Sequence, residues 1–298
     1  MTVAPDRSHR GTIFVEDAEV ITQSTHPGEQ FILRVRAPEC AQRATPGAFA
    51  HIRCDADIAM RRPLSIMRAD PINGEVDFLY KIVGHGLRAL STLCAGDHVN
   101  IMGPIGNGFS PASSRPKKLM VGGGVGIPPM VFLAEYFVAA GEQDLLVLMG
   151  SEVPFPFTLT ESEIAVAGIS PSASHGIAVL ENIAVPSRLA SLQNYAGTHR
   201  GYVTDLAREW LQSLDDTERA AVDMFACGPE PMLAAAAKIA SEFNVSCQLS
   251  LEEYMACAVG GCAGCTVPVH LPAGTAMQRV CVDGPVFDAR TIYPVGQN

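Results

Sequence analysis

LMVGGGVGIPPMVFLAEYFVAAG (residues 119–141) begins as an apolar strand, passes through a glycine turn and continues with apolar residues at helical spacing as far as Gly141. LLVLMG (145–150) and DMFACG (223–228) are short, continuously apolar runs, which are typical of buried parallel strands. PEPMLAAAAKIASEF (229–243) follows the second run and predicts another helix. Because strands and helices alternate, residues 115–245 are predicted to form a doubly wound α/β domain.

Working outward, the N-terminal residues 11–112 predict a small antiparallel β-barrel. Short, partly alternating apolar runs are separated by Gly, Pro and Asn. The expected strands lie in TIFVEDAEVIT (12–22), EQFILRVRAPE (29–39), GAFAHIRC (47–54), GEVDFLYKIVG (74–84) and DHVNIMGPIG (97–106). A polar, Pro-containing stretch, residues 113–118, predicts the linker to the next domain.

The C-terminal residues 246–298 carry four crowded cysteines, with four, two and fifteen residues between successive members: Cys257, Cys262, Cys265 and Cys281. This is the plant-type spacing for a 2Fe-2S cluster. Glycines 260, 261 and 264 allow the loop to curl and to present N–H groups to the sulfurs. Structural zinc, which favours two Cys-x2-Cys pairs, and a set of buried free thiols are the alternatives. A 2Fe-2S centre carries one electron, so the spacing predicts electron transfer.

The glycine turn after the first α/β strand is a candidate nucleotide site, formed by Gly122, Gly123, Gly124 and Gly126. Glycine allows the backbone to approach a pyrophosphate, and the following helix supplies N–H donors. The spacing is not that of the G-x-G-x-x-G fingerprint, and such turns also occur for packing alone. Cys227, Gly228 and Pro229 end a second strand, and their turn is expected to face the same crevice.

Two stretches of the predicted barrel are candidate anion sites. RRPLSI (61–66) offers an arginine fork and a serine hydroxyl, which suit a phosphate and the heteroatoms of a planar ring. LYKIVGHG (79–86) brings Lys81 beside a Gly84-x-Gly86 turn. Either stretch alone would ordinarily be a surface turn.

Composition excludes several classes of protein. Among 298 residues, 21 Lys and Arg against 31 Asp and Glu give a formal charge of −10, which argues against nucleic-acid binding. The 48% hydrophobic fraction excludes a disordered chain. No secretory signal is visible in residues 1–11, and the longest uncharged stretch, 119–134, is too short and too broken to span a membrane. An odd total of nine cysteines argues against a disulfide framework, so a cytoplasmic location is expected.

Taken together, these motifs resemble those of the ferredoxin reductase superfamily, and most closely the electron-transfer subunit of the NAD-dependent class of dihydroorotate dehydrogenase. RRPLSI, LYKIVGHG, DHVNIMGPIGNGF, VGGGVGIPPM, ACGPEPML, EEYMACAVGGCAGC and RVCVDGPVF match that family in order and spacing over almost the whole chain. The resemblance implies an α+β multidomain oxidoreductase with an FAD-binding barrel (11–112), an NAD-binding α/β domain (115–245) and a 2Fe-2S module (246–298).

The resemblance also implies roles for individual residues. The flavin and its phosphates would be held by Arg62, Pro63, Leu64, Ser65, Leu79, Tyr80, Lys81, Gly86 and Leu87. Leu87 departs from the family, which usually has Thr or Ser there, and leaves only a backbone N–H. The glycines of the 122–126 turn would face the NAD pyrophosphate, while Cys227, Gly228 and Pro229 would lie beside the nicotinamide, with Cys227 as the catalytic residue. No arginine pair for a 2′-phosphate is evident, which favours NAD over NADP.

The implied function is electron transfer between NAD(H) and an FMN-containing dihydroorotate dehydrogenase catalytic subunit, in pyrimidine biosynthesis. Because this chain has no barrel that oxidises dihydroorotate, a hetero-oligomer is expected. The alternatives are a diaphorase or hydrogenase-type reductase subunit with another partner, a zinc-containing binding module, and a redox-sensing regulator. Residues 151–200 carry no motif, are longer than the family usually has there, and predict one helix over 186–194.

Overall fold

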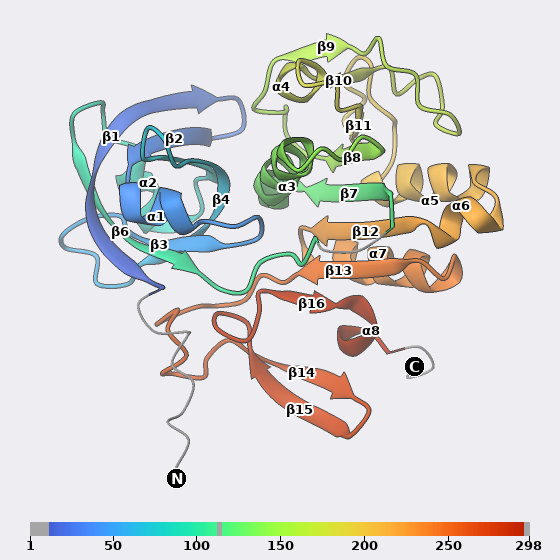
Figure 1. Cartoon of the computed structure of the whole chain (residues 1–298). Coiled ribbons are helices and arrows are strands. Elements are labelled where there is room, and N and C mark those ends of the chain that lie inside the picture. Colours follow the sequence, from blue (N-terminus) through green and yellow to red (C-terminus); the bar gives the residue numbers. More distant parts are fainter. Residues whose placement is uncertain (1–11, 112–114, 295–298) are drawn as a thin grey trace.

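The computed structural model describes residues 12–111 and 115–294 of the chain. Residues 1–11, where no secretory signal is expected, and Ser113 and Ser114 of the predicted linker lie outside them. A β-barrel and an open sheet lie side by side, and a hairpin module adjoins both (Figure 1).

The barrel is closed by six antiparallel strands, as the spacing of the apolar runs predicts. Its order is β1 (Phe14–His26), β2 (Gln30–Arg36), β5 (Glu75–Lys81), β4 (Arg62–Asp70), β3 (Phe49–Arg53) and β6 (His98–Ile105). Alternate side chains such as Leu33, Ile52 and Phe78 fill its interior. Two short helices, α1 (Pro38–Arg43) and α2 (Gly84–Leu90), connect its strands.

The α/β domain has a six-stranded sheet with helices on both faces, which confirms the doubly wound prediction. Its order is β11 (Ser187–Ala190), β8 (Leu145–Gly150), β7 (Lys117–Gly123), β12 (Val222–Cys227), β13 (Ser246–Ser250) and β16 (Val286–Asp288). All neighbours are parallel except β16, which is antiparallel to β13. Helix α3 (Ile127–Ala139) covers one face, while α5 (Val203–Ser213) and α7 (Glu230–Glu242) cover the other.

Two local predictions are wrong. Residues 186–194, expected to be helical, contain the edge strand β11, because Ser187–Ala190 is a fully buried run that pairs with β8. The predicted linker 113–118 overlaps β7, which begins at Lys117 and pairs with β8 from Lys118 onward. The rest of the 151–200 stretch holds β9 (Leu159–Glu161), β10 (His175–Ile177) and the short helix α4 (Ala178–Glu181), and α6 (Asp216–Ala220) follows α5.

The C-terminal part does not stand apart from the other two domains. It contributes β13 and β16 to the large sheet, so the sheet runs past the division expected at residue 246. The hairpin β14 (Thr266–Leu271) and β15 (Gly274–Arg279) and the short helix α8 (Ala289–Ile292) complete it. Its core contains Cys265 and Cys281 together with Phe49 and Ile105 of the barrel. The cysteine loop is therefore packed directly against the barrel.

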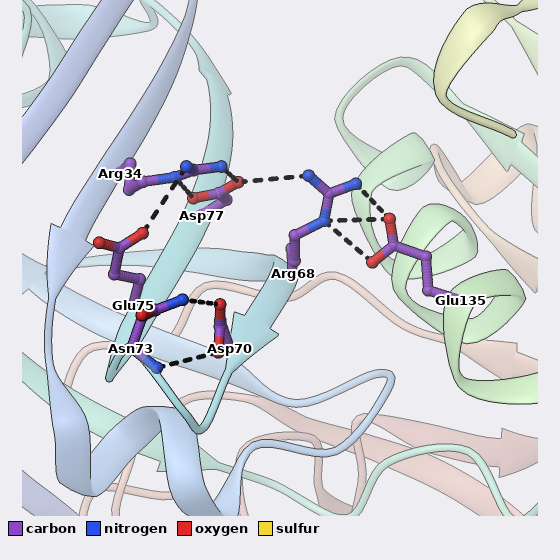
Figure 2. A network of polar contacts seen from close by, with 7 residues as sticks. All are labelled: Arg34, Arg68, Asp70, Asn73, Glu75, Asp77 and Glu135. Atoms are coloured by element: carbon purple, nitrogen blue, oxygen red, sulfur yellow. Dashed lines mark hydrogen bonds and ion pairs between the residues drawn. The ribbon is translucent and has the colours of Figure 1, made fainter. Parts of the chain in front are cut away.

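Helix α3 joins the barrel to the sheet. Phe132 of α3 belongs to the barrel core, and Met67 and Leu79 of the barrel belong to the core beneath α3. Arg68 of β4 reaches across to Glu135 of α3 on one side and towards Asp77 of β5 on the other (Figure 2). The two domains thus share both apolar and charged contacts.

Candidate redox site at the domain junction

A cleft of about 610 Å³ opens where the barrel, the sheet and the cysteine module meet. One wall comes from β3, β4 and β5 of the barrel, and another from the ends of β12 and β13. Eleven of the predicted site residues line it: Arg62, Pro63, Leu64, Ser65, Leu79, Tyr80, Lys81, Leu87, Gly126, Cys227 and Gly228. The structure therefore brings together stretches that are far apart in the sequence.

On the barrel side, the predicted residues contribute in different ways. Arg62 lies at the start of β4, and its guanidinium occupies the space that a Cβ on Gly86 would need, 3.1 Å away. Gly86 therefore allows the Arg62 side chain to lie close to the main chain of α2, while lying outside the cleft lining itself. Ser65 is partly exposed beside Phe49, its partner on β3. Its hydroxyl is available to a ligand.

Other predicted barrel residues face inward. The Tyr80 hydroxyl donates to Oε1 of Gln23 at 2.9 Å, and its ring stacks on Phe31 inside the barrel. Since Tyr80 is 1% exposed, only its main chain is available to the cleft. Leu64 and Leu87 likewise belong to the barrel core. Lys81, at the end of β5, is partly exposed and offers an ammonium group.

The two turns of the α/β domain meet at the topological switch point. The chain leaves β7 towards β8 and β11 and returns to β12 on the other side of β7. Ligands of open α/β sheets bind outside the carboxyl ends of the strands at such a point. Cys227 at the end of β12 pairs with Gly122 of β7, so both predicted turns lie there.

The glycines of these turns divide by role. A Cβ on Gly126 would lie 2.2 Å from the Cys227 carbonyl oxygen, and one on Gly123 would lie 2.5 Å from the Met232 sulfur. A Cβ on Gly122 would crowd the start of α3, and Pro229 packs at the start of α7 near Gly123. Gly124 alone has a positive φ, 55°, with open space around it. Close packing between the two turns thus explains Gly123 and Gly126, packing against the start of α3 explains Gly122, and Gly124 is open to a ligand.

Cys227 is a buried thiol at the bottom of the cleft. Burial raises its pKa to about 12, and a hydrogen bond with Ser250 opposes this only in part. The thiol is therefore neutral at physiological pH. It offers a small, polarisable, uncharged surface to a bound ring.

Sequence reasoning missed one wall of the cleft, residues Ser250–Met255. This segment leaves the end of β13 and leads into the cysteine loop. Desolvation in the cleft, together with the carboxylate of Glu253, raises the pKa of Glu252. The position of the segment between a sheet strand and the first cluster cysteine was the available signal, because strand ends in this sheet face the crevice.

The four predicted cluster cysteines come together as two pairs. The side chain of Cys257 interacts with Cys262, and that of Cys265 with Cys281. Within residues 12–111 and 115–294, no three Cys, His, Asp or Glu side chains meet where they would hold a single ion. Four neighbouring thiols are the ligand set that a 2Fe-2S cluster requires.

Main-chain N–H groups surround these sulfurs. The N–H of Gly264 donates to the Cys262 sulfur at 3.4 Å, and the N–H groups of Gly261 and Gly260 are directed at Cys257 and Cys281. Burial raises the pKa of Cys257, but its main-chain donors bring it down to about 7. The three loop glycines therefore have the expected role of stabilising negative charge on sulfur.

A buried histidine lies between the barrel and the cysteine loop. His51 of β3 is 1% exposed, pairs in register with Pro63 of β4, and has no hydrogen-bond partner for either ring nitrogen among the described residues. Burial lowers its pKa to about 4; the Met255 main chain opposes this in part, and Arg61 and Arg62 add smaller effects in the lowering direction. The imidazole is consequently neutral at physiological pH.

Comparison with known proteins agrees with this geometry. Residues 252–293 match the family model described as the iron-sulfur cluster binding domain of dihydroorotate dehydrogenase B. In the parts of the chain that the structure describes, no helix is long and apolar enough to cross a membrane.

Relatives and solved structures extend the similarity over most of the chain. Dihydroorotate dehydrogenase B (NAD(+)), electron transfer subunit, of Caldanaerobacter subterraneus is 34% identical over 83% of this chain and 86% of its own length. The same subunit of Bacillus caldolyticus is 36% identical over 82% and 85%. The structure of an NADH-dependent reduced ferredoxin-NADP oxidoreductase matches with a TM-score of 0.73 and 25% identity over 93% of this chain and 90% of the other. The cytochrome b5 reductase domain of Ulva prolifera nitrate reductase shares the fold, with a TM-score of 0.56 and 18% identity over 82% of this chain and 96% of that domain. The chain therefore belongs to the family of the electron transfer subunit of NAD(+)-dependent dihydroorotate dehydrogenase B.

Proposed function

We propose that this protein relays electrons between NAD(H) and an FMN-containing dihydroorotate dehydrogenase catalytic subunit in the cytoplasm, using FAD and a 2Fe-2S cluster. The observation that carries the proposal is the arrangement at the junction. Two pairs of thiols lie at the end of a segment, Ser250–Met255, that also lines the cleft between the barrel and the nucleotide turns.

The residues present suit these groups. Arg62 and Lys81 are cations at the barrel wall for the FAD phosphates, and Ser65 and the main chains of Leu79 and Tyr80 suit the polar edge of the flavin ring. Gly124 and the start of α3 suit the NAD pyrophosphate. Cys257, Cys262, Cys265 and Cys281 would ligate the cluster.

A bound flavin supplies the exchange between two-electron hydride transfer with the nicotinamide and single-electron transfer with the cluster. The protein contributes placement. The neutral Cys227 thiol provides a ring-facing surface without charge, and the Gly126 contact with Cys227 fixes the two nucleotide turns against each other.

Anaerobically purified protein tests the proposal. We expect about one FAD and two irons per chain, with flavin and cluster absorbance that both bleach with NADH. Cys281→Ala should lose the iron and the cluster signal while NADH still bleaches the flavin. Cys247→Ala is the matched control, because Cys247 is also buried but lies in the core beneath α7. A colourless protein that contains zinc would contradict the proposal.

A second candidate has a specific observation in its favour. The match to an NADH-dependent reduced ferredoxin-NADP oxidoreductase covers 93% of this chain. It supports the alternative of a reductase subunit with another redox partner. The identity of the co-purifying chain distinguishes the two functions. If the partner is a dihydroorotate-oxidising subunit, dihydroorotate should reduce the cluster in the complex but not in this chain alone.

A further inference from the structure

The GPIGNGF stretch, residues 103–109, has no part in the site described above, yet it touches all three parts of the molecule. It includes the last three residues of β6, Gly103–Ile105, and the chain that leaves the barrel after them. Phe109 packs edge-on against Phe225 of the large sheet, at 5.7 Å between ring centroids. Its main-chain N–H donates to the Pro46 carbonyl of the barrel at 2.8 Å.

The third contact of this stretch is with the loop that carries Cys281. The Asn107 amide nitrogen Nδ2 donates to the carbonyls of Val282 and Asp283, at 3.1 and 3.2 Å. The Asn107 main-chain N–H donates to the Gly284 carbonyl at 2.6 Å, and its carbonyl accepts from the N–H of Val286 at 3.4 Å. One residue of the barrel thus holds the chain immediately after a cluster cysteine by four hydrogen bonds.

The neighbouring glycines permit this approach. A Cβ on Gly106 would lie 2.4 Å from Cδ of Pro285, and one on Gly108 would lie 2.3 Å from the Pro46 carbonyl oxygen. Gly106 also has a φ of 91°, which side chains rarely adopt. The stretch is therefore shaped to bring Asn107 against the Cys281 loop.

The same loop is braced from within the module. Asp283 accepts from the Arg279 main-chain N–H at 2.8 Å and from its Nε at 3.1 Å, and Arg279 donates to the Gly260 carbonyl at 3.1 Å. These bonds tie the Cys281 loop to the Cys257–Cys265 loop. They do not reach the barrel, whereas the Asn107 side chain donates hydrogen bonds to this turn from the chain that leaves β6, beside the apolar packing of the module against Phe49.

We infer that Asn107 is a positioning residue for electron transfer, which fixes the Cys281 side of the cluster relative to the flavin-binding barrel. The inference rests on the proposed function. It concerns the distance and orientation of the cluster, to which transfer between two carriers is sensitive, and not the binding of either nucleotide, since Asn107 is outside the cleft lining.

The test compares Asn107→Ala and Asn107→Asp with Gln248→Ala in the anaerobic holoprotein. Asn107→Asp keeps the size of the side chain but removes the two donors. Gln248 of β13 is a matched control, because its side chain makes a similarly exposed pair of hydrogen bonds with Ser110, three residues after Asn107, and makes none with the cluster loop. Stopped-flow absorbance would follow flavin reduction by NADH and the subsequent cluster reduction separately.

We expect both Asn107 variants to reduce the flavin at the wild-type rate and the cluster several-fold more slowly, with an altered electron paramagnetic resonance spectrum of the dithionite-reduced cluster and faster hydrogen exchange at 282–286. Loss of iron with retained FAD would also support the inference. Wild-type behaviour of both variants, equal slowing of flavin and cluster, or the same defect in Gln248→Ala would overturn it. Wild-type protein that lacks flavin or iron would instead contradict the proposed function.

Discussion

At the scale of single residues, His51 makes a prediction about pH. Its pKa is lowered from 6.5 to about 4 by burial and by two nearby arginines, so the folded protein excludes a proton that the unfolded chain binds. Its contribution to stability is complete above pH 6.5 and is lost as the pH falls from 6.5 towards 4. The full loss is at most about 3 to 4 kcal/mol, from about 1.4 kcal/mol per pKa unit.

Urea unfolding of wild type and His51→Gln at pH 7.5 and pH 5.0 would measure this effect. The wild type should lose more stability than the variant between the two values. His85→Gln is the control, because His85 is exposed on α2 and should leave the wild-type pH response unchanged. Parallel pH profiles for wild type and His51→Gln would contradict the account.

Residue identities alone point to the four cluster cysteines, an assignment that stays a prediction, and they describe the barrel residues less completely. Four thiols at a fixed spacing must converge, so their pattern carries the site. Tyr80 shows the limit: its neighbours in sequence reach the cleft, while its own side chain is committed to Gln23 and Phe31 on other strands. The alternation of apolar and polar residues indicates which side chains share a face of the strand. Contacts with other strands of the barrel decide which of these faces a ligand meets.

At the scale of elements, the turn after β7 makes a prediction about two glycines. Gly126→Ala places a Cβ 2.2 Å from the Cys227 carbonyl, where main chain must move, so it should cost at least about 2 kcal/mol of stability. Gly124→Ala has open space and only a positive φ of 55° to accommodate, at about 1 kcal/mol. Urea unfolding distinguishes them.

The variants Gly126→Ala and Gly124→Ala also distinguish a glycine needed for packing from one that faces the ligand. Gly124→Ala should weaken NADH binding beyond its small effect on stability, because it adds a methyl group at the open side of the turn. An equal loss of stability in the two variants would contradict the division of roles among these glycines. The sequence predicted the turn itself, but a glycine that faces Cys227 and one that faces solvent look alike until β7 and β12 are placed side by side.

Whether a segment forms a helix or a strand was also harder to predict where the segment is short. Ser187–Ala190 is too brief for its periodicity to distinguish strand from helix, and its pairing with β8 decides the outcome. The long apolar helix α3 and the strands β8 and β12 were predicted within a few residues, because each has a continuous pattern and clear ends.

At the scale of the whole molecule, the joint between barrel and sheet could not be predicted from the motifs. Arg68 and Glu135 lie 67 residues apart, and nothing in the sequence links Arg68 to the quoted 119–141 stretch that contains Glu135, yet they form the charged contact between β4 and α3 (Figure 2). Arg34 holds Asp77 at 2.7 Å on the barrel side, and Asp77 lies 3.9 Å from Arg68. A chain of four charges thus runs from the barrel wall to α3.

This chain of charges predicts that Glu135→Gln weakens the contact between the barrel and the α/β domain. The Arg68 side chain is 33% exposed and that of Glu135 is 24% exposed, so the pair is partly shielded and its loss should cost about 1 kcal/mol. Because the cleft lies between the two domains that the pair connects, we expect FAD to dissociate more readily from the variant, and the effect to diminish in high salt. Fluorescence of released FAD on heating, at low and high ionic strength, would measure it.

Glu39→Gln provides the comparison, since Glu39 pairs with Arg43 within the short helix α1 and joins no two domains. Both substitutions remove one carboxylate from an arginine, and both leave the net charge changed by the same amount. If the change in net charge causes earlier FAD release, both variants should release FAD at the same lowered temperature. If loss of the contact between β4 and α3 causes it, only Glu135→Gln should do so. Retention of FAD by Glu135→Gln at the wild-type temperature in low salt would mean that the apolar contacts of Phe132, Met67 and Leu79 hold the two domains together without the ion pair.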